Sequence, residues 1–348
     1  MSDNFVSETA ARIFADLADP QTINKARDDA WKTALWRALS ENGLTLAWVP
    51  EALGGAGAEI ADGFAVLNVA GRYAAAVPLA ETLLAGWLLA RAGLKAPEGA
   101  MSVAPARPGD QITLASDGTV SGRARAVPFA KDAMHLAVLA GTSVALVETA
   151  ACRLGDGTNL ASEASNSVTF DRVKPLAVAP AKGIDATALL LMGCVVRAVE
   201  TAGALEAILD MTVRYANERV AFEKKIAKFQ AVQHNLARLA GESAAALAAA
   251  TSAADTINDN TSFDEDAVFL EAVAAKIRCA EAAEKGGAIA HQVHGAIGFT
   301  IEHILHRYSL RALSWRDDFG SESHWAVELG KRVASRGADE LWPLVASR

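Results

Sequence analysis

Residues 214–237, RYANERVAFEKKIAKFQAVQHNLA, decide the fold of this chain. They join two helix-forming segments through a short break at residues 222–228. The surrounding segment, residues 181–339, contains no proline and is rich in Ala, Leu, Glu and Lys, so it is predicted to be helical. Three more breaks, near residues 258–264, 295–298 and 319–321, divide it into about five helices, enough for a long bundle. Asp264 is expected to cap the helix that runs to about His294.

Residues 101–182 differ from the helical segment because short β-leaning runs alternate with turns that contain glycine or proline. Asp117-Gly118 lies between two such runs, which indicates a hairpin. Short strands at this spacing predict a small β-barrel or sandwich. The expected strands are residues 111–116, 119–127, 135–140, 143–148 and 167–173.

The N-terminal hundred residues are predicted to be helical, with apolar residues at helical spacing over residues 28–42, 60–76 and 78–93. A chain of 348 residues is too long for one hydrophobic core. We therefore expect a mainly α fold with a central β domain, an α+β architecture. Its domains are expected to be an N-terminal helical domain at 1–100, a middle β domain at 101–182 and a C-terminal helical bundle at 183–348.

Composition excludes some classes of function. The formal net charge is −8, which argues against nucleic acid as the main partner. Three widely spaced cysteines suggest neither a disulfide framework nor a metal site. No membrane span is expected, and the N-terminal residues lack the apolar stretch of a signal peptide, so a cytoplasmic location is expected.

Three motifs, in this order of helical, β and helical segments, resemble the acyl-CoA dehydrogenase family. Val49-Pro50-Glu51, followed by LGGAG, looks like the family's proline–glutamate–glycine turn. Residues 214–237 are similar to its Y-x-x-x-R-x-x-F-G-x-x-I-x-x-x-Q signature. Residues 292–312, QVHGAIGFTIEHILHRYSLRA, resemble its Q-x-x-G-G-x-G-x-x-x-E segment.

The resemblance implies FAD as cofactor, an acyl-CoA substrate and an electron-transfer flavoprotein as electron acceptor. In the family the arginine motif reaches the flavin of a neighbouring subunit, which implies a homo- or hetero-oligomer, a dimer or a tetramer. A guanidinium at a helix terminus can bind a pyrophosphate through bidentate, charge-assisted bonds, and an aromatic ring can pack against a flat ring. The expected cofactor-binding residues are Arg219, Phe222, Gln230, Gln292, Gly295 and Gly320.

The catalytic base is harder to place. The family's usual glutamate directly precedes a glycine, and here Phe319 precedes Gly320. Asp317 or Asp318 is the best substitute, although the two can also form a surface pair. Some members carry the base near the start of an earlier helix; the corresponding position is about Gly193, where no acid occurs.

The sequence departs from the family at the flavin-contacting loops as well. SVAPARPGDQ stands in place of the usual flavin-binding loop, Pro128 and Ala130 replace an aromatic–hydroxyl pair, and Glu223 replaces a glycine. Such losses resemble the small subunits of heteromeric bacterial acyl-CoA dehydrogenases, for example those of steroid side-chain degradation.

Several alternatives remain open from the sequence. The chain can be an active dehydrogenase of CoA thioesters, a catalytically inert partner subunit, or a flavin-dependent monooxygenase or oxidase on the same fold. Four histidines, His291, His294, His303 and His306, can share helix faces, but glutamates at di-iron spacing are too few, and no metal is expected.

Overall fold

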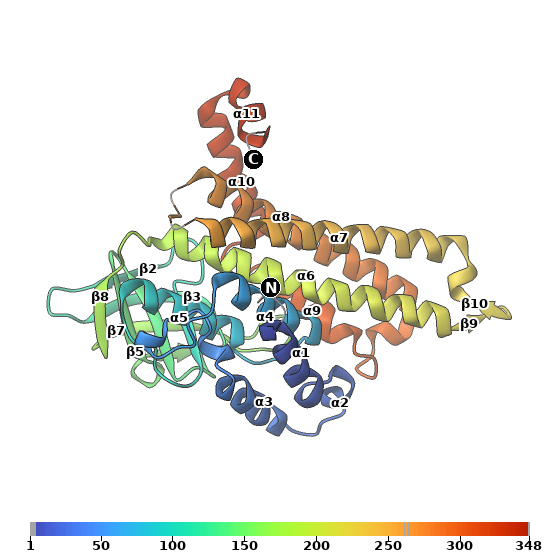
Figure 1. Ribbon diagram of the computed structural model, residues 1–348, viewed down its shortest axis with the longest axis horizontal. Helices are drawn as coiled ribbons and strands as arrows, with labels where there is room; N and C mark the ends of the chain where they lie inside the picture. The colour runs from blue at the N-terminus through green and yellow to red at the C-terminus, as the bar shows by residue number, and fades with distance from the viewer. Residues whose placement is uncertain (1–4, 261, 264, 347–348) are drawn as a thin grey trace.

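The computed structural model describes residues 5–260, 262–263 and 265–346. Helices come first along the chain, two β-sheets follow, and a long helical bundle completes it (Figure 1). This order confirms the expected α+β architecture. The division into three domains at the expected limits stays a prediction, although strands begin at Met101 and the long helices begin at Ala186.

The N-terminal segment is helical because apolar side chains recur at helical spacing along it. The three expected helices are confirmed within a few residues, and two helices at the N-terminal end were not predicted individually. The bounds are α1 (Phe5–Leu17), α2 (Pro20–Asn24), α3 (Ala30–Glu41), α4 (Ile60–Tyr73) and α5 (Leu79–Ala92). Almost every residue of α5 is buried, so this helix lies inside the molecule.

The β segment forms two four-stranded sheets, ordered β1-β4-β5-β8 and β2-β3-β7-β6. All pairs are antiparallel except β1 with β4, and the Asp117-Gly118 hairpin joins β2 and β3 as expected. The five expected strands are present, and β1, β6 and β8, of three or four residues each, were missed. Strand β2 is as short, but the adjacent Asp117-Gly118 turn marked it. The bounds are β1 (Met101–Ala104), β2 (Gln111–Leu114), β3 (Val120–Pro128), β4 (His135–Ala140), β5 (Ser143–Glu148), β6 (Arg153–Gly155), β7 (Ser165–Val173) and β8 (Ala177–Pro180).

The bundle is built on three long helices, α6 (Ala186–Glu218), α7 (Gln230–Asp259) and α8 (Asp266–His294), which pack against one another. The predicted break between the first two is the small hairpin of β9 (Val220–Ala221) and β10 (Lys224–Lys225). Among the described residues three further helices follow α8, so this part of the chain has one α-helix more than the five expected. They are α9 (Leu305–Trp315), α10 (Glu322–Arg336) and α11 (Leu341–Ala346). The expected cap Asp264 lies outside the described residues.

Helix α6 is the central element of the bundle. Its length and composition would suffice for crossing a membrane, but its most apolar window is entirely buried within the fold, as in a core helix. Gly193 lies near its first residue and Arg219 directly follows its last. At 1.5 Å per residue the two positions are about 39 Å apart along the helix.

Candidate functional site

The free end of the bundle carries the arginine motif, and we call residues 214–230 the tip (Figure 1). Arg219 ends α6, and its carbonyl accepts a bond from the amide of Ile226 at 2.9 Å, which closes the β9–β10 hairpin. Its side chain is exposed and forms no ion pair in the part of the chain that the structure describes. The guanidinium is therefore free to bind an anion.

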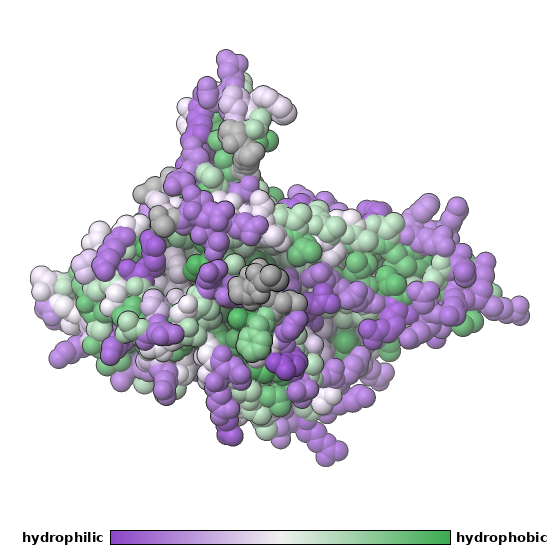
Figure 2. All heavy atoms as spheres, in the orientation of Figure 1, coloured by the Kyte–Doolittle hydropathy of each residue, from purple (hydrophilic) through white to green (hydrophobic). Residues whose placement is uncertain are grey.

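Phe222 is presented to solvent by the turn of the hairpin. It and Glu223 have positive φ angles of 51° and 64°, which is uncommon for residues with side chains. The ring of Phe222 is 89% exposed and touches only the edge of Phe229, at 6.3 Å between centroids. A large exposed aromatic side chain beside exposed Val220 marks a contact surface. Figure 2 shows this end of the bundle as a mixture of charged and apolar surface.

Gln292 and Gly295 lie at the same end of the molecule as Arg219. The hydroxyl of Tyr215, one turn before Arg219, donates to the carbonyl of His294 at 3.2 Å, so the last turns of α6 and α8 are adjacent. Gly295 has φ 64° and ψ −146°, a conformation open essentially to glycine alone, and a Cβ atom there would have nothing within 4 Å. This backbone is therefore open to close approach by a ligand.

The tip is positively charged, although the chain as a whole is negative. Residues 214–228 contain five cationic side chains and two carboxylates. Gln230, the first residue of α7, is also exposed at this end. The structure thus brings five of the six expected cofactor-binding residues to one end of the bundle, with a charge that suits a pyrophosphate.

The histidines beside the tip stack against rings. His294 packs on Tyr215 at 4.4 Å and on His303 at 4.6 Å between centroids, and His291 packs on Phe299 at 4.5 Å. Burial lowers the pKa of His291, His294 and His303. The cluster is thus kept neutral and supports the loop that follows α8.

The family's two base positions lie at the opposite end of α6, against each other. A Cβ atom at Gly193 would overlap the ring of Phe319, which is 1% exposed. An aromatic ring thus occupies the space beside Gly193. Neither position holds a carboxylate, so this region offers no base at the family's places.

Asp318 belongs to a buried ionic network centred on Arg197. The guanidinium of Arg197 donates to Asp318 Oδ2 at 3.0 Å, to Glu200 Oε2 at 2.6 Å and to the carboxylate of Glu81. The Nζ of Lys276 donates to the backbone carbonyl of Asp318 at 2.6 Å. This pairing disfavours Asp318 as a base because its carboxylate is already neutralised by a buried cation.

The network also includes one of the divergent loops. Arg107, in the stretch SVAPARPGDQ, approaches Asp318 Oδ1 at 3.6 Å. Ser102, in the same stretch, donates to the carbonyl of Pro128 at 2.6 Å, which joins β1 to the end of β3. The Arg107 contact thus places this divergent stretch beside the buried network.

The remaining predicted residues of this region have different environments. Asp317 is exposed, and its amide donates to Ser314 at 3.2 Å. Gly320 is covered by Trp325, whose Nε1 donates to the carbonyl of Phe319 at 3.0 Å, and a Cβ atom at Gly320 would lie 2.5 Å from that nitrogen. Unlike Gly295, Gly320 faces an indole ring and not open space.

Burial shifts the pKa values of the network. Desolvation raises the pKa of Glu200 to about 7 and raises that of Glu81, each opposed by Arg197. Desolvation also lowers the pKa of Lys276. Sequence reasoning missed Glu81, Arg197, Glu200 and Lys276; the available signal was a charged residue within a mostly apolar helical run.

An FAD molecule therefore fits one end of this chain better than the other. The tip offers a free guanidinium, an exposed ring and an open glycine backbone. The region around Phe319 is filled by side chains, and its charges neutralise one another. The predicted roles of the individual site residues stay predictions.

Comparisons with known proteins agree with this architecture. The model of the acyl-CoA dehydrogenase N-terminal domain matches residues 3–97, and that of the C-terminal domain matches residues 183–322. The acyl-CoA dehydrogenase IpdE2 of Mycobacterium tuberculosis is 31% identical over 338 residues, covering 96% of this chain and 96% of its own.

Solved structures give the same result. The ChsE4-ChsE5 complex from Mycobacterium tuberculosis has a chain that is 23% identical, with a TM-score of 0.84 over 97% of this chain and 98% of its own. A variant of the Tcur3481-Tcur3483 steroid ACAD is 26% identical, with a TM-score of 0.82 over 95% and 97%. The chain belongs to the acyl-CoA dehydrogenase family of FAD-dependent oxidoreductases.

Proposed function

We propose that this chain is one subunit of a heteromeric acyl-CoA dehydrogenase, in which its tip completes a flavin site on a partner subunit. The observation that carries the proposal is the contrast along α6. The open tip and the closed base position lie about 39 Å apart on one rigid helix. A flavin that contacts the tip cannot also contact Phe319 of the same chain, so the reacting end of the site belongs to another chain.

Bound FAD supplies the hydride acceptor for α,β-dehydrogenation of a CoA thioester, with electrons passed on to an electron-transfer flavoprotein. The residues of this chain bind and orient. Arg219 would hold the pyrophosphate through bidentate bonds, and Phe222 would pack against a flat ring. The backbone at Gly295 would permit close approach, and Gln292 would donate its amide.

Known assemblies support a heteromeric arrangement. The two similar structures named above are each described by a pair of chains, ChsE4 with ChsE5 and Tcur3481 with Tcur3483. The partner in our proposal is a homologue that carries the catalytic glutamate, and the assembly acts in the cytoplasm.

The main alternative is an enzyme in which this chain supplies its own base. Asp317 favours it, because this carboxylate is exposed and lies two residues from Phe319. A flavin-dependent monooxygenase or oxidase on the same fold needs no such base, and activity without a CoA thioester would distinguish it.

The experiment is to purify the chain alone and together with a homologue that has the catalytic glutamate, and to measure visible absorption and mass in solution. We expect little flavin in the chain alone and a yellow complex with one flavin for each pair of unlike chains. Dehydrogenation of acyl-CoA thioesters should appear only in the complex.

The opposite result is equally clear. A yellow protein with one flavin for each copy of this chain, active without a partner, would refute the proposal. The double variant Asp317→Asn, Asp318→Asn would then show whether either carboxylate is the base.

A further inference from the structure

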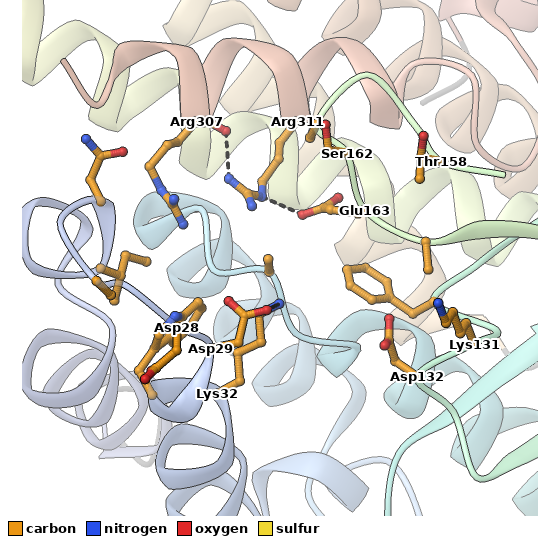
Figure 3. A pocket seen from close by; sticks show the side chains of 18 of the residues that line it. Asp28, Asp29, Lys32, Lys131, Asp132, Thr158, Ser162, Glu163, Arg307 and Arg311 are labelled. Atoms are coloured by element: carbon orange, nitrogen blue, oxygen red, sulfur yellow. Dashed lines mark hydrogen bonds and ion pairs between the residues drawn. The ribbon is translucent and has the colours of Figure 1, made fainter. Parts of the chain in front are cut away.

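A second feature of the molecule is a cavity that none of the predicted catalytic or cofactor-binding residues lines. This cavity, of about 860 Å³, opens between α9, the segment leading into α3, and two loops of the β-sheets (Figure 3). Its size is in the range of sites for small molecules. It is lined by residues from five separate segments of the chain, so the cavity exists only in the folded protein.

Arg307 of α9 points into this cavity without a partner (Figure 3). Its Nε is buried and has no hydrogen-bond partner, and its guanidinium forms no ion pair among the described residues. Desolvation, together with the nearby charge of Arg311, lowers the pKa of Arg307 to about 10. The guanidinium is still cationic at neutral pH and is uncompensated.

The carboxylates that influence Arg307 are already paired with other cations. Glu163 accepts from Nε of Arg311 at 2.6 Å, and both side chains are buried. Asp29 pairs with Lys32 at 2.7 Å. Arg311 also donates to the carbonyl of Arg307 at 3.0 Å, which fixes the backbone of α9 beside the loop that carries Glu163.

A partly buried cation without a partner is costly unless a bound group neutralises it. An oxyanion satisfies a guanidinium best, because the planar donors match a carboxylate or phosphate. The same cavity is lined by the apolar faces of Trp31 and Phe129. Those rings favour a ligand whose anionic group is attached to an apolar or aromatic body.

We propose that this cavity binds a small ligand through a carboxylate or phosphate group held by Arg307, with the body of the ligand packed against Trp31 and Phe129. The site does not depend on the tip, and the inference goes beyond the proposed dehydrogenase function. A chain that binds no flavin can still bind this ligand.

The test uses the full chain and three probes: inorganic phosphate, acetate and benzoate. Isothermal titration measures affinity, and the fluorescence of Trp31, identified by its loss in Trp31→Phe, reports the location. We expect saturable binding, with benzoate tighter than acetate because the ring packs on apolar side chains. Arg307→Gln should weaken binding about 10- to 100-fold, as expected for loss of a charged hydrogen-bonding partner.

The matched control is Arg316→Gln. Arg316 follows the same helix, but it pairs with Glu284 and Glu322, so it has no free charge for a ligand. This variant should bind the probes as the original chain does. Arg307→Lys keeps the charge and serves if Arg307→Gln folds poorly, as judged by circular dichroism; it should retain weakened binding.

The proposal is overturned if the original chain binds none of the probes, or if Arg307→Gln binds them unchanged. A response to phosphate alone identifies a phosphate ligand, and a response to benzoate alone identifies a carboxylate ligand. Either result supports the site, and neither depends on whether flavin binds at the tip.

Discussion

The tip and the region around Phe319, which in the family contribute to the flavin sites of different subunits, have opposite properties in this chain. At the tip, the side chains of Arg219 and Phe222 are exposed to solvent, and the guanidinium of Arg219 has no ion pair among the described residues. Around Phe319, three carboxylates are bound by the buried guanidinium of Arg197, and a ring packs on Gly193. Exposed side chains without partners are available to bind another molecule, whereas buried side chains that pair within the chain stabilise the fold.

The largest expected effect is at the centre of the buried network. Arg197→Met should lower the free energy of unfolding by about 3–5 kcal/mol, because it leaves Glu81, Glu200 and Asp318 buried without their cation. Urea denaturation measures this. The control Arg172→Met, at an exposed pair with Asp117, should cost less than about 1 kcal/mol. Equal losses would mean that the network is not central to stability.

The next effect concerns the tip. Arg219→Ala should weaken FAD binding to the heteromeric complex about 10- to 100-fold, because charged hydrogen bonds to the pyrophosphate are lost. Flavin fluorescence titration of the deflavinated complex measures it. The free energy of unfolding should be unchanged, because the side chain of Arg219 is exposed. Lys225→Ala, on the same hairpin, is the control, and an equal loss there would show a general charge effect and not a specific site.

Substitutions at two neighbouring carboxylates, Asp317 and Asp318, distinguish an effect on stability from an effect on catalysis. Asp318→Asn should cost about 1–3 kcal/mol of unfolding free energy through the weakened network. Asp317→Asn, at the surface, should change it by less than about 0.5 kcal/mol. Neither should lower kcat of the complex, because the proposed function places the base in the partner. A loss of about 100-fold or more in either variant would place the base in this chain.

The smallest expected effect is a pH dependence. Burial raises the pKa of Glu200 from its ordinary value to about 7, so the folded chain holds more protons than the unfolded chain between those values. Stability from this group is therefore present at acidic pH and is lost as pH rises through about 7. Glu200→Gln should flatten the change in unfolding free energy between pH 5 and pH 8. Glu206→Gln, on the same helix but more exposed, should leave it in place.

Much of the fold follows from local sequence patterns. The absence of proline over residues 181–339 predicted the bundle, and Asp117-Gly118 predicted the β2–β3 hairpin. The short strands β1, β6 and β8 were not predicted, because three or four residues carry too little periodicity and, unlike β2, none of them borders the Asp117-Gly118 turn. Whether such a short segment becomes a strand depends on the strand with which it pairs.

The candidate site residues also divide into those that the sequence located and those whose surroundings only the structure shows. Arg219 and Gly295 were predicted from the resemblance of residues 214–237 and 292–312 to the family's motifs, and the structure places both at the same end of the bundle. Gly320 was placed with them by adjacency to the expected base, but Trp325 covers it. Asp318 was chosen for its charge, and only the structure shows the guanidinium of Arg197 on it.

The sequence by itself determined the family, the order of helices and strands, and the position of the arginine motif at the end of a long helix. The tertiary structure alone decided that one part of the site is open and the other filled. Arg197 meets Glu81 and Asp318 across 116 and 121 residues of chain, and the cavity around Arg307 depends on five separate segments. Backbone preferences act over a few residues, whereas burial and ion pairing depend on neighbours that only folding brings together.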